Sequence, residues 1–198
     1  MMQKIKPILI PAIIIGLISG LIIVVYNITY VDTSTVVTAK QLAAVNQIYG
    51  EGDYSVIPVS EYPEALLTTN EKGNKICNIP ELSKIVKKSD GSIAFDMIVK
   101  GYKKGFDIMV GVKDGKVAGV AVVSVGEETP GLGTNTNKPE WLANFKDKTG
   151  EVVIVKNKAA LGENEVNAVT SATFSSKGVA KAVNLALKAF NACGGDFK

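Results

Sequence analysis

Five hydroxyl side chains lie within nine residues of the sequence, in the stretch AVTSATFSS (Ala168–Ser176). A pattern typical of an amphipathic helix follows directly, over about Ser176–Phe190. Ser and Thr are usual at a helix start, because their oxygens accept hydrogen bonds from the first unpaired N–H groups. Taken alone, such a cluster is most often a cap, but capping uses only one or two hydroxyls. The stretch therefore holds more hydroxyls than a cap needs, namely those of Thr170, Ser171, Thr173, Ser175 and Ser176.

A second stretch that could bind a ligand is the glycine-rich segment GEETPGLGTNTNKP (Gly126–Pro139). Pro130 restricts its own φ angle, whereas Gly131 and Gly133 allow backbone shapes that other residues resist. Glycines also let a flat ligand approach the main chain closely. An ordinary strand-to-helix connection has the same composition, so the segment alone does not establish a site. The Gly-x-x-x-x-Gly-Lys pattern of a phosphate-binding P-loop is absent.

The composition excludes several kinds of site. The chain has 198 residues and a formal net charge of +3, which gives no indication of nucleic-acid binding. All 22 basic residues are Lys, so the bidentate Arg fork for phosphate is missing. Without His, a Ser-His-Asp triad, a Cys-His dyad and a His-containing zinc site are excluded. Cys77 and Cys193 form no CxxC motif and cannot supply four ligands to an iron–sulfur cluster; whether they pair is open. A carboxylate or a Lys could still act as a base, so the composition does not exclude an enzyme. We nevertheless predict no metal site, and no residue stands out as a catalytic acid or base.

The N-terminal region has the length and composition of a membrane anchor. No charged residue occurs over Pro7–Val31, and the run Ile8–Val25 is apolar apart from glycines, one serine and one proline. About 20 such residues are needed to cross a bilayer as a helix. A cleaved signal peptide would have an apolar region of about 7–15 residues and a nearby small-residue cleavage site. The best candidate, Val37–Ala39, is poor and distant, so we predict an uncleaved transmembrane helix.

Charges on either side of this run predict its orientation. Lys4 and Lys6 precede it and Asp32 follows it. The positive-inside rule then places the N-terminus in the cytoplasm and residues 32–198 outside. Tyr26 and Tyr30 fit an interfacial anchor better than an electron path. Gly16 and Gly20 would permit close helix packing, or are incidental in a lipid-facing helix.

The remaining residues predict an α+β fold, with an antiparallel sheet flanked by helices. A helical pattern that starts after possible caps at Asp32–Ser34 includes Val37 and ends at Gly50. Asp114-Gly115 is a strong signal for a hairpin turn. We divide the chain into 1–31 (cytoplasmic N-terminus and anchor), 32–92 (connecting helix and first part of the exported domain) and 93–198 (core domain). Predicted strands are Ile93–Val99, Phe106–Val112, Val117–Val125 and Glu151–Val155, and predicted short helices are Glu81–Lys88 and Pro139–Phe145.

The order of these motifs resembles the FMN-binding domain family. Gly101-Tyr102, the Asp-Gly hairpin, ETPGLG (Glu128–Gly133), a short helix with an aromatic residue, a strand and TSAT (Thr170–Thr173) follow in the family's order. The similarity is greatest to the G subunits of Rnf electron-transport complexes, which are relatives of the C subunits of Na⁺-translocating NADH:quinone reductases. In that family the last Thr of [ST]-G-A-T is esterified to the phosphate of FMN, which implies covalent FMN on Thr173.

Three positions depart from the family pattern. Ser171 replaces the usual Gly of the motif, and Asn167 stands where an acidic residue often begins it. Gly126 or Glu127 stands where some members have His. None of these changes removes the hydroxyl that the ester requires.

The resemblance implies a division of the cofactor site between the two stretches. We expect Thr129–Gly133, in the first stretch, to line the isoalloxazine ring and Thr170–Lys177, in the second, to hold the phosphate. Trp141 and Phe145 are expected to pack the short helix into the core rather than stack on the ring. The first loop contributes Glu128, Thr129, Pro130, Gly131, Leu132 and Gly133, and the second contributes Thr170, Ser171, Ala172, Thr173, Ser175, Ser176 and Lys177.

The resemblance also implies a function. The chain would be a membrane-anchored electron carrier in a ferredoxin:NAD⁺ oxidoreductase complex that couples electron flow to Na⁺ or H⁺ translocation. Its partners would be polytopic membrane subunits and, during maturation, a flavin transferase that donates FMN from FAD. Two alternatives stay open: a stand-alone exported flavoprotein for extracellular electron transfer, and a cofactor-free assembly subunit of a membrane complex.

Overall fold

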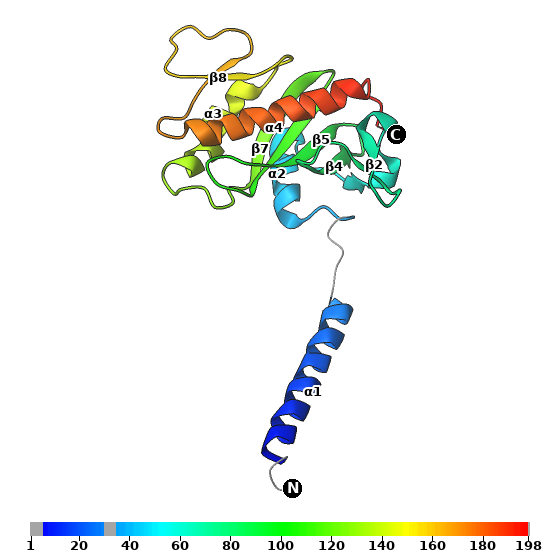
Figure 1. Ribbon diagram of the computed structural model, residues 1–198. Helices are drawn as coiled ribbons and strands as arrows, with labels where there is room; N and C mark the ends of the chain where they lie inside the picture. The colour runs from blue at the N-terminus through cyan, green and yellow to red at the C-terminus, as the bar shows by residue number, and fades with distance from the viewer. Residues whose placement is uncertain (1–5, 30–34, 198) are drawn as a thin grey trace. The chain divides into compact units, whose positions relative to one another are not determined.

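The computed structural model describes residues 6–29 and 35–197 (Figure 1). The chain divides into two compact units, Met1–Thr33 and Ser34–Lys198. The sequence features at Lys4, Tyr30 and Asp32–Ser34 lie outside the described residues.

The first unit contains one long helix, α1 (Lys6–Thr29), which includes Pro11. Its apolar side chains from Ile10 onward are exposed, with Ile28 at 79%. Among the described residues, Ile10–Thr29 is the one span long and apolar enough to cross a membrane. In water, these apolar side chains would have to be buried against other residues, and no described residue of this unit packs on them. The predicted apolar helix is therefore confirmed.

The second unit begins with helix α2 (Ala39–Tyr49), which has a complete capping box. Thr38 Oγ1 accepts a hydrogen bond from the Gln41 N–H at 3.4 Å, and Gln41 Oε1 accepts one from the Thr38 N–H at 3.0 Å. Helix α2 ends before Gly50, as the sequence predicts. Its cap is thus Thr38, a residue that the sequence analysis did not single out.

A five-stranded antiparallel sheet forms the centre of this unit, in the order β1-β4-β5-β6-β7. The predicted hairpin is confirmed, with Asp114 and Gly115 both at positive φ in its turn. The domain boundary predicted at residues 92–93 lies within this sheet, between β4 and β5. The strands are β1 (Tyr54–Ile57), β4 (Leu82–Lys88), β5 (Ile93–Val99), β6 (Phe106–Lys113) and β7 (Lys116–Ser124).

Strand β4 corrects the short helix predicted at Glu81–Lys88. Its lysines recur at a spacing that a helix could also produce. In the structure, however, Ile85 and Val86 are both buried, on opposite faces of the sheet. Strand β4 pairs with β1 on one side and with β5 on the other. Tertiary pairing of these branched side chains has overridden the local pattern.

The sheet is covered by a helix on each face (Figure 1). Helix α4 (Thr173–Ala192) packs on the larger core, which includes Phe95, Ile108 and Val110. Helix α2 packs on the smaller core, which includes Val86 and Met109. The predicted α+β architecture, an antiparallel sheet between helices, is confirmed.

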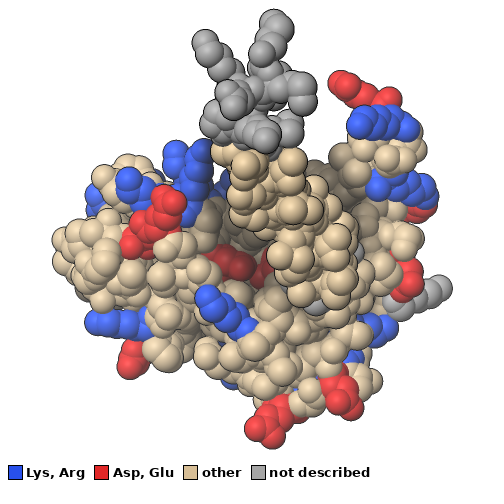
Figure 2. Space-filling model, turned by 90° about the horizontal axis from the view of Figure 1, so that it is seen from below, with Lys and Arg blue, Asp and Glu red and all other residues tan. Residues whose placement is uncertain are grey.

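The other elements surround this centre. Helix α3 (Pro139–Leu142) and the 3₁₀ turn η5 (Ala143–Phe145) together match the predicted short helix. The strand predicted at Glu151–Val155 is shorter and pairs in parallel with β9, outside the main sheet. Lysine and acidic side chains are interspersed over the face of the molecule seen in Figure 2. The remaining elements are β2 (Leu67–Thr69), β3 (Lys75–Cys77), β8 (Val153–Val155), β9 (Glu165–Asn167), η2 (Val59–Glu61), η3 (Glu64–Leu66) and η4 (Gly133–Asn137).

Candidate cofactor site

The hydroxyl cluster lies at the start of α4, which begins at Thr173, three residues earlier than predicted. The N-cap residue is Ala172, and no side chain caps the helix. Ser176 N–H is the first amide of the helix to bond back, to Ala172 O at 2.9 Å. The N–H groups of Thr173, Phe174 and Ser175 precede it, at the positive end of the helix dipole.

The five hydroxyls have two different roles in the structure. Ser176 Oγ donates to Ala172 O at 2.9 Å and accepts from the Val169 N–H at 3.0 Å, which fixes the turn before the helix. Ser175 Oγ donates to Glu128 Oε2 at 2.5 Å. Ser175 and Ser176 are both buried, and their hydroxyls are already hydrogen-bonded to other groups of the protein.

The other three hydroxyls are available to a ligand. Thr170 and Ser171 are exposed and Thr173 is half-buried. No hydrogen bond from these three hydroxyls to another described residue is found. The hydroxyl of Thr173, at the first helical position, thus remains accessible and chemically unused by the described part of the protein.

Ser171 adopts a left-handed backbone conformation, with φ at 61°. Such a conformation costs a non-glycine residue roughly 1 kcal/mol, whereas Gly adopts it freely. The turn is closed by a hydrogen bond from the Ala172 N–H to Val169 O at 2.9 Å. The geometry explains why Gly is usual at this position of the motif. Ser171 adopts this left-handed turn at a strain cost that Gly would not have.

Glu128 links the glycine-rich loop to the start of helix α4. Its side chain is 4% exposed and accepts hydrogen bonds from Ser175 Oγ and, at 2.9 Å, from the Lys103 N–H. A Cβ atom at Gly133 would lie 2.0 Å from Glu128 Oε2, and one at Gly101 would lie 2.4 Å from Oε1. Glycine at both positions therefore makes room for the carboxylate. The Glu and the last Gly of ETPGLG act together as a structural link to α4.

The glycine-rich loop is held by its own hydrogen bonds. The Gly131 N–H donates to Thr134 Oγ1 at 2.9 Å, and Asn135 Nδ2 donates to Gly131 O at 2.6 Å. Gly131 has a φ of 72°, the left-handed region that favours glycine. The loop is thus preformed beside the start of α4.

A cavity of about 400 Å³ lies where the two loops meet. Its volume falls within the range of roughly 300–1,000 Å³ that is usual for small-molecule and cofactor sites. The structure thereby brings together residues from both predicted stretches. Other predicted residues, namely Pro130, Gly131, Thr170, Ser176 and Lys177, are not among those that line it. The lining consists of Tyr102, Glu128, Thr129, Leu132, Gly133, Ser171, Ala172, Thr173, Phe174 and Ser175.

Two aromatic residues of this lining were missed by the sequence analysis. Tyr102 and Phe174 are 58% and 66% exposed, and their ring centroids lie 6.4 Å apart. Large exposed rings beside a cavity suit contact with a flat aromatic ligand. A signal for Phe174 was available, because helical spacing places it on the same face as Lys177 and Lys181, away from the apolar stripe.

Trp141 and Phe145 have the predicted role in packing. Their rings meet edge to face with centroids 5.0 Å apart, and both belong to or pack against the larger core. Trp141 Nε1 donates to Asn167 O at 2.7 Å. The Asn167 side chain both accepts from the Lys158 N–H and donates to Lys158 O, each at 2.9 Å. A carboxylate could not donate, so Asn suits this loop better than the acid usual in the family.

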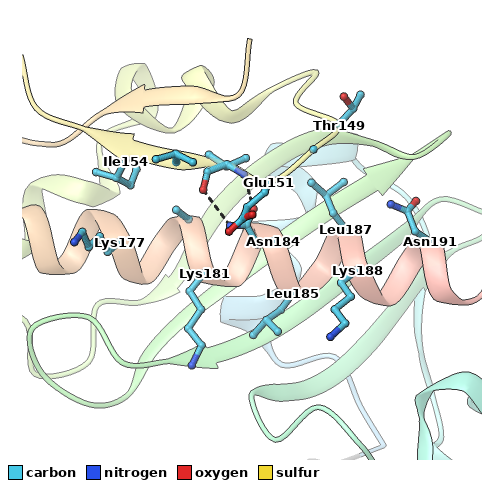
Figure 3. Close-up of a pocket in the computed structure, with 14 residues that line it drawn as sticks. Thr149, Glu151, Ile154, Lys177, Lys181, Asn184, Leu185, Leu187, Lys188 and Asn191 are labelled. Atoms are coloured by element: carbon cyan, nitrogen blue, oxygen red, sulfur yellow. Dashed lines mark hydrogen bonds between the residues drawn. The ribbon is translucent and has the colours of Figure 1, made fainter. Parts of the chain in front are cut away.

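A larger hollow, of about 710 Å³, lies between α4 and residues 149–154 (Figure 3). Asn184 bridges its walls, accepting from the Val152 N–H at 2.8 Å and donating to Val152 O at 3.0 Å. Lys177 and Lys181 both line this hollow, and Lys181 pairs with Glu81 at 2.5 Å. This hollow contains neither predicted motif apart from Lys177. The smaller cavity at Thr173 is therefore the candidate cofactor site.

Comparison with known proteins identifies relatives of this chain. The FMN-binding domain family matches residues 101–188. The chain is 32% identical over 175 residues to the G subunit of the proton-translocating ferredoxin:NAD⁺ oxidoreductase complex of Clostridium ljungdahlii, covering 86% of this chain and 83% of that protein. It is 30% identical over 112 residues to the G subunit of the Na⁺-translocating complex of Acetobacterium woodii, covering 53% of each. A crystal structure of NqrC from Shewanella oneidensis matches 68% of this chain and 71% of that chain, with 22% identity and a TM-score of 0.48.

Proposed function

The chain belongs to the family of G subunits of ferredoxin:NAD⁺ oxidoreductase complexes, and on that premise we propose that it carries FMN in ester linkage to Thr173. The observation that supports this most strongly is that Thr173, half-buried and with a hydroxyl unused by the described residues, lines the cavity where the two loops meet. The N–H groups at the start of α4 lie beside it, where they can donate to phosphate oxygens.

The residues around Thr173 fit an FMN group. Bound flavin would supply the redox chemistry, and the protein would supply position and surroundings. Tyr102 and Phe174 offer exposed ring faces, and Leu132, 44% exposed, adds an apolar contact. Thr129 and Gly133 of the glycine-rich loop also line the cavity. Lys103, whose ammonium lies 5.8 Å from the Tyr102 ring centroid, brings a positive charge in place of the missing Arg.

The ester bond would form between Thr173 Oγ1 and the phosphorus of the FMN half of FAD. AMP is then the leaving group, and the hydroxyl proton is released. A flavin transferase would catalyse this step. The ester keeps the cofactor attached to a domain that we propose lies outside the cytoplasm.

We further propose that α1 anchors the chain in the membrane, with the N-terminus in the cytoplasm. The apolar length of Ile10–Thr29 supports the anchor, and the lysines before it support the orientation. In this arrangement the chain relays electrons between other membrane subunits of a complex that translocates Na⁺ or H⁺. Protease added to intact cells should remove the domain, and its full protection would contradict the orientation.

A denaturing gel of the full chain tests the attachment. The chain is produced with a flavin transferase, together with Thr173→Ala and the matched control Thr170→Ala, an exposed hydroxyl in the same turn. We expect flavin fluorescence in the wild-type and Thr170→Ala bands and none in the Thr173→Ala band. Fluorescence that persists in Thr173→Ala would place the ester elsewhere. A dark wild-type band would favour the cofactor-free assembly subunit. Co-purification with polytopic subunits separates a complex subunit from a stand-alone flavoprotein.

A further inference from the structure

A cluster of charged and polar side chains is buried between the sheet and α2, on the face opposite α4. Lys84 is 8% exposed and Asp96 is 1% exposed. Lys84 lies directly opposite Asp96 on neighbouring strands, and Asp107 lies opposite Ile98, one diagonal step from Asp96. Side chains alternate along strands, so Lys84, Asp96 and Asp107 all project toward the α2 side.

The contacts of this cluster leave two carboxylate oxygens without a donor. Gln41 Nε2 donates to Asp96 Oδ2 at 2.7 Å. Lys84 Nζ donates to Gln41 Oε1 at 3.2 Å and to Val36 O at 3.0 Å. Asp96 Oδ1 and Asp107 Oδ1 are both buried, and neither has a hydrogen-bond partner among the described residues when both acids are ionised. Buried polar atoms are nearly always paired, so these two oxygens need an explanation.

The charges of the cluster also fail to balance when both acids are ionised. Two carboxylates and one ammonium leave a net negative charge in a buried layer, which is costly. One proton removes the excess charge. The same proton turns one carboxyl oxygen into a donor and the other into its acceptor, and so satisfies both orphan oxygens.

We propose that Asp96 and Asp107 form a proton-binding site, in which one proton is shared by the two carboxyl groups at neutral pH. Burial, a hydrogen bond with Asp96 and repulsion by its charge raise the pKa of Asp107 to about 8, against the opposing attraction of Lys84. The group that faces the pair from α2, Gln41, is uncharged, as is Ser124, the partner of Asp107 on β7.

From the opposite face, Tyr62 feels the charge of Asp96, and burial raises the pKa of Tyr62 to about 12, so it stays neutral. Gln41 also belongs to the capping box of α2. A continuous set of hydrogen bonds therefore links the proton site to Thr38, at the start of the helix that follows the membrane span in the chain. Loss of the proton would place two like charges beside Gln41 and weaken this attachment.

The pH dependence of stability tests the proposal, independently of any flavin. The folded chain would hold a proton that the unfolded chain releases at the ordinary Asp pKa, so stability should fall as pH rises between about 5 and 8. The sequence has no His, so few other groups titrate in this window. Unfolding of the full chain in detergent micelles is followed by Trp141, the single tryptophan, which lies in the domain.

We expect the folding equilibrium constant of the wild type to fall up to tenfold per pH unit in this window. Asp107→Asn should remove most of this dependence, and the exposed control Asp53→Asn should keep it. An Asp107→Asn variant with the wild-type slope would overturn the proposal.

Two further measurements test the site if Asp107→Asn fails to fold and distinguish a proton site from a sodium site. In the wild type, ¹³C-labelled aspartate should show one carboxyl that titrates near pH 8 by NMR, whereas titration of every carboxyl below pH 5 would refute the site even if Asp107→Asn failed to fold. At pH 9, Na⁺ and K⁺ should have equal effects on stability. Stabilisation by Na⁺ alone that Asp107→Asn abolishes would make the pair a sodium site instead.

Discussion

The polar groups on the two faces of the central sheet differ in their exposure. On the α4 side, the polar groups gather at the start of the helix, where the Thr173 hydroxyl is accessible beside a cavity. On the α2 side, Lys84 and Asp96 are buried within the packed layer itself. The first arrangement leaves room for a ligand from outside, and the second must balance its charges internally. Changes at Thr173 should therefore alter cofactor content, and changes in the buried cluster should alter stability.

The largest expected effect is on the buried side. Lys84→Met removes the cation of the cluster and leaves the remaining negative charge of the Asp96–Asp107 pair without a counter-charge. Breaking a buried charge cluster in this way costs about 3–5 kcal/mol. The free energy of unfolding, measured with denaturant through Trp141 fluorescence, should fall by that amount. Lys87→Met, a partly exposed lysine of the same strand, serves as the control. Equal losses in both variants would remove the distinction between the two faces.

Gly133→Ala should cause the next largest loss in the free energy of unfolding. Gly133 packs against Glu128, the side chain that links the glycine-rich loop to helix α4. The new methyl group would lie 2.0 Å from Glu128 Oε2 and would displace the carboxylate that holds Ser175. Overpacking of this kind costs about 1–3 kcal/mol. Thermal unfolding and flavin content per chain are measured together. Leu132→Ala, next to it but exposed, should leave stability nearly unchanged, and a fully stable Gly133→Ala variant would argue against the close packing.

Ser171→Gly should act in the opposite direction. Gly accepts the φ of 61° without strain, so the variant should gain about 1 kcal/mol in the free energy of unfolding. It restores the residue usual in the family, and flavin attachment should be at least as complete as in the wild type. Thr170→Gly is the control and should show no gain. A loss of stability in Ser171→Gly would mean that the hydroxyl, rather than the backbone shape, matters there.

Phe174→Ala should have the smallest effect on stability and a visible effect on the cofactor. Because the ring is 66% exposed, its removal should change the free energy of unfolding by less than about 0.5 kcal/mol. The visible absorption spectrum of bound flavin should shift, since an aromatic contact is lost. An unchanged spectrum would show that the ring of the flavin lies away from the aromatic pair.

Much of the fold could be predicted from the sequence, because its signals were local. The Asp114-Gly115 turn and the apolar segments on either side identified the hairpin strands to within one residue at each end. The segment Glu81–Lys88 was assigned wrongly because its character as a strand depends on two neighbouring strands. The buried cluster was missed for the same reason, since Lys84, Asp96 and Asp107 meet only across the sheet.

The candidate site was predictable in its motifs and less so in its contacts. The sequence indicated that TSAT and ETPGLG belong together, and the structure places both beside one cavity. It could not show that Glu128 and Ser175 bond to each other beneath that cavity, because 47 residues separate them. Nor could it show that the turn at Ser171 is left-handed in a residue other than Gly.

The mass of the intact chain tests the central proposal most directly. The protein is produced in cells that contain a flavin transferase and is purified in detergent. We predict a mass greater than that of the sequence by one FMN less one water, with the addition confined by fragmentation to the peptide that contains Thr173. A wild-type chain at the unmodified mass, or an equal addition in Thr173→Ala, would contradict the account.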